Sequence, residues 1–199
     1  MAGRGKKPFL IKGILLDFDG TITEPFFDWP AIKSEMGIGD MLILDAMAAA
    51  TPERRAKLNE IMDRWERDAA DYAIIRDGAV ALLDALRTRG INAAVVTNNC
   101  TRNVEAVAAR LSLNLPPIVS RDCGSYKPSL EFMKVALSVV GTPPEETAIA
   151  GDSVLDIRAG RAAGLCTIFL GREPVEITPD FRVSDSHALL ELVLQLAAK

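Results

Sequence analysis

Three apolar runs in the chain end at polar residues, a pattern that predicts buried strands of one parallel sheet. They span Phe9–Leu16, Ile91–Val96 and Thr147–Ala150, and a shorter run covers Pro117–Ser120. Nearly continuous apolar runs with β-branched residues are typical of strands that are covered on both faces. The carboxyl ends of such strands lie at one edge of the sheet, where open α/β folds bind their ligands.

Helical patterns alternate with these runs from Ile75 onward, which predicts an α/β fold made of βαβ units. Residues 24–75 differ, because they contain helical stretches and no convincing strand. We expect one α/β core formed by residues 1–23 and 76–199, with residues 24–75 as an insertion.

The insertion is predicted to hold three helices. They cover about residues 28–36, 40–50 and 52–71. The last begins with Thr51-Pro52-Glu53, which provides an N-cap, a proline at the first helical position and an acid in the first turn.

Asp17 and Asp19 follow the first apolar run. Because side chains alternate along an extended chain, carboxylates two residues apart can converge on one spot. Such a pair is costly unless it shares a cation or one acid is protonated, and Mg²⁺ with oxygen ligands meets the first condition. Gly20 lets the backbone leave the strand with its N–H groups near a bound anion. The alternative is a capped strand end or an Asx turn.

Thr97-Asn98-Asn99 ends the second run and precedes a helical pattern. A hydroxyl here, with backbone N–H groups of the following turn, would form a cradle for phosphate oxygens at a helix N-terminus. The alternative is that Thr97 or Asn98 caps the helix. Both are compatible, because Asn99 or Thr101 could be the cap while Thr97 faces a ligand.

Lys127-Pro128-Ser129 follows the short run, and Pro128 is expected in the first turn of a helix. Lys127 would then be fixed at the helix start. A lone lysine is ordinarily a solvated surface charge. A site with several carboxylates and a phosphate requires more positive charge than one Mg²⁺ supplies, which favours a functional lysine here.

Gly151-Asp152-Ser153 ends the third run, and Asp156 follows one helical turn later. If Ser153 opens a helix, both carboxylates face the same sheet edge as the first acid pair. An oxygen ligand from Asp152 would help to complete the near-octahedral shell of Mg²⁺. The alternatives are an N-cap for Asp152 and a favourable charge near the helix dipole for Asp156.

These four motifs occur in the order found in the haloacid dehalogenase superfamily of phosphohydrolases, and the chain resembles that family from about Phe9 to Leu170. The likeness also includes Gly160, Ala162-Ala163 and Gly164. It implies a Rossmann-like three-layer α/β/α core with a parallel sheet and a small helical cap, as in the phosphoglycolate-phosphatase-like branch. The cap would be residues 24–75, with hinges at 23–25 and 76–78, and would close over the site and select the substrate.

The resemblance implies Mg²⁺ as cofactor and a role for each motif residue. Asp17 would be the nucleophile that forms an aspartyl-phosphate. Asp19 would protonate the leaving alcohol and then deprotonate the attacking water. The metal ligands would be the side chains of Asp17 and Asp152 and the backbone carbonyl of Asp19.

The remaining motif residues would hold the phosphate. Thr97, Gly20 and the backbone near Asn98 would bind its oxygens, and Lys127 would neutralise the charge between nucleophile and phosphate. Asp156 would lie outside the metal shell and orient a bound water or the lysine.

The expected function is hydrolysis of a phosphomonoester of a small metabolite. A phosphomutase would share all four motifs, but a cap of only about 50 residues favours hydrolysis. A binding module without turnover is disfavoured by the joint presence of Asp17, Asp19, Lys127 and Asp152. A dehalogenase is disfavoured because Asp19 would have no leaving group to protonate.

Composition limits the number of domains, the binding partners and the cellular compartment that we expect for this chain. Its 199 residues, 49% hydrophobic and 25% charged, suit one globular core with an appendage. A net charge of -4 gives no electrostatic case for nucleic acid or an anionic membrane. The three scattered cysteines favour a reducing cytoplasm over a disulfide framework or a zinc site. Residues 1–7 are interpreted as a short basic tail rather than a signal peptide, and no uncharged apolar run reaches membrane-spanning length.

Several further residues have two interpretations. Phe26, Phe27 and Trp29 could line the leaving-group pocket, but packing within the cap is favoured. Cys100 at a helix start could have an activated thiol, but a packing role is favoured. The only histidine, His187, is assigned no catalytic role. A solvated charged face is expected for the cap arginines Arg54, Arg55, Arg64 and Arg67.

Overall fold

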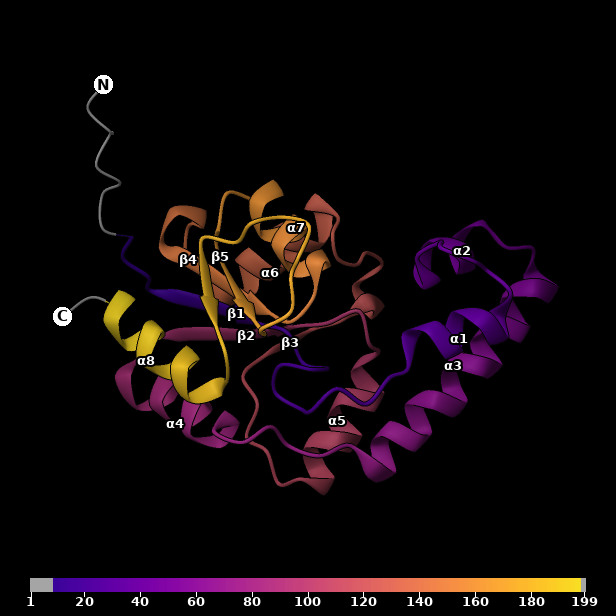
Figure 1. Cartoon of the computed structure of the whole chain (residues 1–199), viewed down its shortest axis with the longest axis horizontal. Helices are drawn as coiled ribbons and strands as arrows, with labels where there is room; N and C mark the ends of the chain where they lie inside the picture. Colours follow the sequence, from indigo (N-terminus) through magenta and orange to yellow (C-terminus); the bar gives the residue numbers. More distant parts are fainter. Residues whose placement is uncertain (1–8, 198–199) are drawn as a thin grey trace.

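A sheet of six parallel strands forms the centre of the molecule, in the order β3-β2-β1-β4-β5-β6 (Figure 1). This computed structural model describes residues 9–197. The strands are β1 Gly13–Leu16, β2 Asn92–Val96, β3 Ile118–Val119, β4 Thr147–Gly151, β5 Cys166–Leu170 and β6 Phe181–Val183. Each predicted apolar run contains a strand, but in the first run strand pairing begins only at Gly13.

Helices cover both faces of this sheet, so the predicted three-layer α/β/α core is confirmed (Figure 1). One face carries α4 Ala79–Arg89, α5 Thr101–Arg110 and α8 Ser186–Leu196, and the other carries α6 Leu130–Val140 and α7 Val154–Ala162. Because side chains alternate along a strand, Ile14 and Leu16 pack into the first hydrophobic cluster and Leu15 packs into the second. This two-sided burial explains why the strands appear in the sequence as continuous apolar runs.

The order of the strands determines where a ligand can enter. From β1 the chain proceeds outward through β2 and β3, and then returns to the other side of β1 to form β4, β5 and β6. Ligands of open α/β sheets bind at such a reversal, outside the carboxyl ends of the strands. In this chain that position is the edge formed by the ends of β1, β2 and β4.

Residues between β1 and α4 form three helices that stand beside the core (Figure 1). They are α1 Trp29–Met36, α2 Ile43–Ala49 and α3 Pro52–Tyr72. These helices share a hydrophobic cluster of their own, formed by Phe27, Ile32, Met36, Met47, Leu58, Met62 and Ala69. The predicted start of α3 is confirmed, because the Thr51 side chain accepts a hydrogen bond from the backbone N–H of Arg54.

Two of the arginines in residues 24–75 do more than form a solvated face, which corrects the sequence interpretation. The Arg55 side chain donates hydrogen bonds to the backbone carbonyls of Met47, at 2.9 Å, and Ala48, at 3.0 Å. Arg54 donates to the carbonyl of Met36. The carbonyl groups at a helix end lack partners within the helix, so these arginines fix the ends of α1 and α2 on α3.

The helical segment joins the core at its base and along α3. Thr23 and Ile75 form an isolated antiparallel bridge, which brings the two ends of the segment together. Helix α3 packs along α5, and Arg110 of α5 donates to the carbonyl of Ala70 at 2.6 Å. Within residues 9–197, none of the helices has the length and apolar character needed to cross a membrane.

Candidate active site

A cavity of about 520 Å³ lies over the carboxyl ends of the central strands, between the core and the helices of residues 24–75. Residues from all four sequence motifs line it, namely Asp17, Asp19, Thr97, Asn98, Lys127 and Asp152. A cavity of this size is typical of sites for small molecules. The structure thus brings together the candidate residues that the sequence placed at strand ends.

Lys127 lies at the bottom of the site and bridges two carboxylates. Its Nζ is 2.6 Å from Asp17 Oδ1 and 2.7 Å from Asp156 Oδ1. Its side chain is only 4% exposed, so the surface-charge alternative is wrong. Burial alone would lower the pKa of Lys127, but Asp156 and Asp17 raise it above its ordinary value, so this lysine stays a cation.

The position of Lys127 is fixed by Asn98 rather than by a helix start. The Asn98 side chain accepts the Lys127 backbone N–H at 2.7 Å and donates to the Lys127 carbonyl at 3.0 Å. Ser129 is the N-cap of α6, and its hydroxyl accepts from the N–H of Phe132. Pro128 therefore precedes the helix, and its predicted place in the first helical turn is wrong.

Asp19 is held by groups from the end of β2. Asn99 Nδ2 donates to both Asp19 carboxylate oxygens, at 3.3 and 3.1 Å, and Thr97 Oγ1 donates to Oδ2 at 3.3 Å. Burial raises the pKa of Asp19 to about 6, against the lowering effect of the Asn99 hydrogen bonds. The group therefore exchanges its proton near neutral pH, as a general acid or base requires.

The start of α5 differs from the sequence expectation. Neither Asn99 nor Thr101 is its N-cap, because that position is occupied by Cys100. The free N–H groups find other acceptors: Asn99 Oδ1 accepts from Cys100 at 2.8 Å, and Asp122 Oδ2 accepts from Thr101 at 2.8 Å. Cys100 is buried, which raises the pKa of its thiol. The structure thus favours packing over an activated thiolate.

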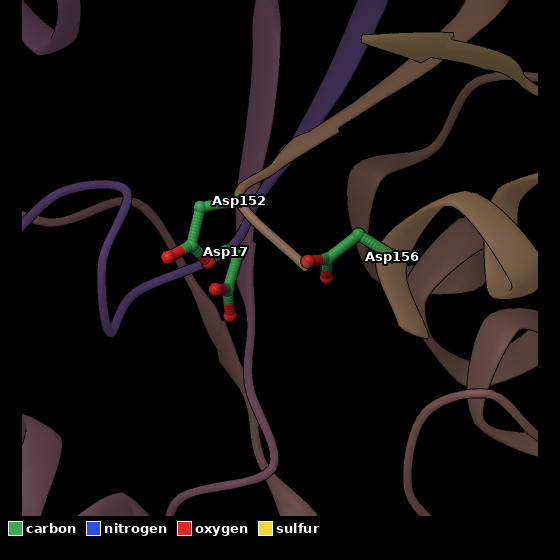
Figure 2. Close-up of side chains that lie close together, drawn as sticks. All are labelled: Asp17, Asp152 and Asp156. Carbon is green, nitrogen blue, oxygen red and sulfur yellow. The ribbon is translucent and has the colours of Figure 1, made fainter. Parts of the chain in front are cut away.

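Three carboxylates converge at the ends of β1 and β4 (Figure 2). Asp17 and Asp152 lie side by side, and Asp156 points toward them from α7. One oxygen of each lies within 4.8 Å of the others. Carboxylate oxygens are the donors that Mg²⁺ prefers, so the donor set fits this ion.

Asp152 and Asp156, the two acids at the end of β4 and the start of α7, have different surroundings. Burial raises the pKa of Asp152 to about 7, and the charge of Asp156 adds to the effect. Asp156 has partners on both oxygens, because Oδ1 accepts from Lys127 and Oδ2 accepts from Ser153 Oγ at 2.6 Å. Ser153 is the N-cap of α7 and forms a capping box with Asp156, so the predicted helix start is confirmed and Asp152 is not the cap.

Asp17 depends on nearby positive charge for its ionisation. Burial raises the pKa of Asp17 well above its ordinary value, Lys127 lowers it, and Asp156 and Asp152 raise it further. One lysine thus faces more than one buried acid. A further cation at this point would favour the ionised form that a nucleophile needs.

Two glycines make room for this cluster. Gly20 has φ +88°, and a Cβ there would lie 2.0 Å from Asp152 Oδ2. A Cβ at Gly151 would lie 2.2 Å from the carboxyl carbon of Asp156. Side chains at either position would displace the carboxylates, which explains glycine in both motifs.

The wall of the cavity contributed by residues 24–75 is mainly apolar. Its side chains include Phe27, Trp29, Leu42, Ile43, Leu44 and Met62. Phe27 and Trp29 stack with ring centroids 4.8 Å apart. Phe27 both packs in the cluster of the three helices and borders the cavity, so the two interpretations of this residue are compatible. His187 lies in α8 against Gly78, consistent with no catalytic role.

Sequence reasoning missed three residues near the site. Asn99 was interpreted only as a helix cap, although it is the main partner of Asp19. Glu66 and Arg121 were not considered; they form an ion pair of 2.6 Å at the cavity wall, in which Glu66 is buried and the Arg121 side chain is 20% exposed. A signal for Glu66 does exist, since it replaces an apolar residue in the buried stripe of α3, which contains Leu58, Met62, Glu66 and Ala69.

Comparisons with known proteins give a consistent result. The family model described as haloacid dehalogenase-like hydrolase matches residues 11–164. A haloacid dehalogenase-like hydrolase domain-containing protein of Arabidopsis thaliana is 27% identical over 208 residues, which cover 93% of this chain and 84% of that protein. N-acetylmuramic acid 6-phosphate phosphatase of Pseudomonas aeruginosa is 30% identical over 189 residues, which cover 81% of this chain and 82% of that protein.

A solved structure supports the fold. The crystal structure of a hydrolase from Pseudomonas syringae superposes with a TM-score of 0.78 at 21% identity, covering 94% of this chain and 99% of that one. At this identity the likeness concerns the arrangement of helices and strands.

Proposed function

Because the chain belongs to the haloacid dehalogenase-like hydrolases, we propose that it hydrolyses a phosphomonoester of a small metabolite with Mg²⁺ and through an aspartyl-phosphate on Asp17. The observation that carries the proposal is the buried Lys127, which contacts Asp17 at 2.6 Å beside Asp152 at the floor of the cavity. Phosphoryl transfer requires a positioned nucleophile and positive charge around the transferring group, and this arrangement supplies both.

The first step forms the covalent intermediate. A carboxylate oxygen of Asp17 attacks phosphorus, the bond from phosphorus to the substrate oxygen breaks, and Asp19 gives its proton to the departing alcohol. In the second step a water gives a proton to Asp19 and its oxygen attacks the phosphorus. Phosphate then leaves and Asp17 is restored. The pKa of about 6 at Asp19 suits both directions of proton transfer.

The residues that would hold Mg²⁺ are the side chains of Asp17 and Asp152 and the backbone carbonyl of Asp19. When bound, Mg²⁺ supplies positive charge that offsets the charge on the phosphoryl oxygens. Asp156 would remain outside the ligand shell, because Lys127 and Ser153 already occupy its oxygens. It would orient Lys127.

The phosphate would be bound by groups around the cavity floor. We assign the hydroxyl of Thr97, the backbone of Gly20 and Asn98 and the ammonium of Lys127 to its oxygens. Thr97 Oγ1 lies 3.3 Å from Asp19 Oδ2, so a phosphate bound at this hydroxyl is adjacent to the proton donor. This proximity is what in-line transfer to Asp17 with protonation by Asp19 requires.

The substrate would be a small phosphorylated metabolite. The relative from Pseudomonas aeruginosa is named for a phosphorylated sugar acid, N-acetylmuramic acid 6-phosphate. The cavity of about 520 Å³ is large enough for a sugar phosphate. We propose that residues 24–75 act as a cap that encloses the leaving group and excludes water, with hinges at 23–25 and 76–78.

The proposal is tested by release of p-nitrophenol from p-nitrophenyl phosphate, with Mg²⁺ and with EDTA. We expect metal-dependent turnover by the wild type and none by Asp17→Asn. Asp84→Asn is the matched control, because Asp84 is an exposed carboxylate of α4 paired with Arg87. Turnover that persists in Asp17→Asn would contradict the assigned nucleophile. Failure of the wild type on this ester and on a panel of metabolite phosphates would contradict hydrolysis itself.

A further inference from the structure

Glu66 is a carboxylate in an apolar setting. It lies on α3 in the same buried stripe as Met62 and Ala69, and it is 2% exposed. A buried carboxylate is costly unless it is paired and hydrogen-bonded, and an apolar residue of similar size would pack here without that cost. The partners of Glu66 therefore indicate what the charge is for.

Both carboxylate oxygens of Glu66 are bound by groups of the core. Arg121 Nη1 donates to Oε1 at 2.6 Å, and the Cys100 thiol donates to Oε2 at 3.2 Å. Arg121 follows β3 and Cys100 follows β2. One side chain of the cap thus holds two different core segments at once.

The first segment leads to the lysine of the site. Arg121 Nη1, which binds Glu66, also donates to the carbonyl of Asn98 at 3.2 Å. The Asn98 side chain in turn holds the backbone of Lys127 through two hydrogen bonds. Lys127 contacts Asp17. The path from α3 to the proposed nucleophile thus consists of direct polar contacts.

The second segment leads to the proposed acid. The backbone N–H of Cys100 donates to Asn99 Oδ1 at 2.8 Å, and Asn99 Nδ2 donates to both oxygens of Asp19. The orientation of the Asn99 amide is thus fixed by Cys100 together with Asn103, whose Nδ2 donates to the same oxygen at 3.1 Å. Glu66 is therefore connected through short series of polar contacts to Asp17, the proposed nucleophile, and to Asp19, the proposed acid.

We propose that Glu66 is a positioning residue, which aligns Lys127 and Asp19 through Arg121 and Cys100 only while α3 is docked on the core. The inference rests on the proposed function, since it assigns roles to Lys127 and Asp19. Its consequence is that cap docking and catalytic competence are linked by one cap carboxylate. A displaced α3 leaves Arg121 without its carboxylate and releases the loop that holds Lys127.

A second contact between the same helices provides the matched control. Asp63 of α3 and Arg102 of α5 form an ion pair of 3.5 Å, with side chains 45% and 78% exposed. Asp63 is one helical turn from Glu66 and also links the cap to the core. Within residues 9–197, its only side-chain polar partner is Arg102, so Asp63→Asn removes a docking contact and leaves the contacts of Glu66 with Arg121 and Cys100 intact.

The experiment compares steady-state hydrolysis of p-nitrophenyl phosphate with Mg²⁺ by wild type, Glu66→Gln and Asp63→Asn. We expect kcat of Glu66→Gln to fall by about 10- to 100-fold, because misplacement of supporting groups has effects of this size. KM should change far less, and Asp63→Asn should match the wild type. Equal losses in both variants would overturn the inference in favour of general docking, and an unchanged kcat in Glu66→Gln would overturn it outright.

Hydrogen exchange gives a readout that does not depend on turnover. Glu66→Gln should speed exchange of the Lys127 amide, which is bonded to Asn98 Oδ1, and of residues 98–100. Asp63→Asn should not. If the wild type hydrolyses no phosphomonoester, the proposed function fails while this measurement still decides whether Glu66 positions the loops. Unchanged exchange in Glu66→Gln would overturn the inference.

Cys100 variants cover the case in which Glu66→Gln fails to fold. Cys100→Ala removes one donor to Glu66 and leaves the ion pair with Arg121, whereas Cys100→Ser keeps a hydroxyl donor at the same place. We expect a several-fold lower kcat in the alanine variant and recovery in the serine variant. Equal kcat values in the two variants would contradict the connection from Glu66 through Cys100 and Asn99 to Asp19.

Discussion

The two sides of the cavity differ in character. We call the motif residues Asp17, Asp19, Lys127 and Asp152, with Asp156 beneath them, the floor, and the side chains from residues 24–75 the wall. The floor is formed by the acids at the strand ends and by Lys127, whose Nζ lies 2.6 Å from Asp17 and 2.7 Å from Asp156. The wall formed by residues 24–75 is mainly apolar, and Trp29 on it remains 44% exposed. Electrostatic chemistry tolerates little displacement, whereas apolar contact tolerates changes in shape. We therefore propose that the reaction takes place at the floor and that the wall selects the substrate.

The sharpest test of the floor is removal of its cation. Lys127→Met would leave Asp17 and Asp156 buried without their partner, so we expect loss of activity and a decrease of about 3 kcal/mol in the free energy of unfolding. Lys134→Met on the exposed side of α6 is the control. Denaturant unfolding and p-nitrophenyl phosphate turnover measure the two effects. Wild-type stability in the Lys127 variant would show that the floor does not need its cation.

The next effect concerns proton transfer. Asp19→Asn should lower kcat/KM by about 10²- to 10⁴-fold for an alkyl phosphate, because kcat/KM reports the step in which the alcohol leaves and that alcohol loses its acid. In the wild type, kcat/KM should fall as pH rises through about 6, where Asp19 loses its proton. A p-nitrophenyl leaving group needs little protonation and should show a weaker effect of both pH and substitution. Equal losses of kcat/KM for the two esters would contradict the role of Asp19 as acid.

Stability provides a smaller and independent test of the floor. Burial raises the pKa of Asp19 to about 6 and that of Asp152 to about 7, so the folded state binds these protons more tightly than the unfolded state. Their contribution to stability is complete below pH 3.8 and is lost as pH rises through 6 to 7. In EDTA we expect the Tm to fall by roughly 5 °C from pH 4.5 to 7.5.

Added Mg²⁺ should reverse most of that loss, because it binds the ionised acids of the folded state. Asp19→Asn removes one of the two titrations and should show a smaller fall in EDTA. Thermal unfolding followed by circular dichroism measures both. A Tm that rises with pH in EDTA would contradict the raised pKa values of this cluster.

The smallest expected effect concerns the wall. Trp29→Ala removes a half-exposed ring that stacks on Phe27, so KM for the preferred substrate should rise by about two- to tenfold with kcat unchanged. Tyr72→Ala is the control, because that ring is 69% exposed and lies outside the cavity lining. An altered kcat with unchanged KM would place Trp29 with the reaction groups and weaken the division between floor and wall.

The same division separates what the sequence could predict from what it could not. Strand ends were predictable, because buried parallel strands are continuous apolar runs and their polar ends identify one sheet edge. Asp17, Thr97 and Asp152 therefore lie where expected. The error at Pro128 has a local cause: Ser129 offers a better N-cap, so the proline is displaced to the loop before α6.

The helical spacing of Leu58, Met62 and Ala69 could have predicted that Glu66 is buried, but not which residues of the core it contacts. Its partners Arg121 and Cys100 follow β3 and β2, and they meet Glu66 only because α3 packs along α5, which no local pattern specifies. Arg55 shows the same limit, since its pairing with helix-end carbonyls requires α2 and α3 to be placed side by side. Long-range partners of charged residues follow from tertiary arrangement rather than from spacing.

The Thr23–Ile75 bridge has a consequence for how this protein can change. Backbone hydrogen bonds from Glu24 to Ile74, at 2.8 Å, and from Arg76 to Ile22, at 3.0 Å, already hold the two ends of the cap together. The entropic cost of closing the intervening chain into a loop then increases only slowly with its length. We therefore expect that α1 and α2 can be shortened, lengthened or exchanged with little effect on the sheet, provided that α3 keeps Glu66 and its packing on α5.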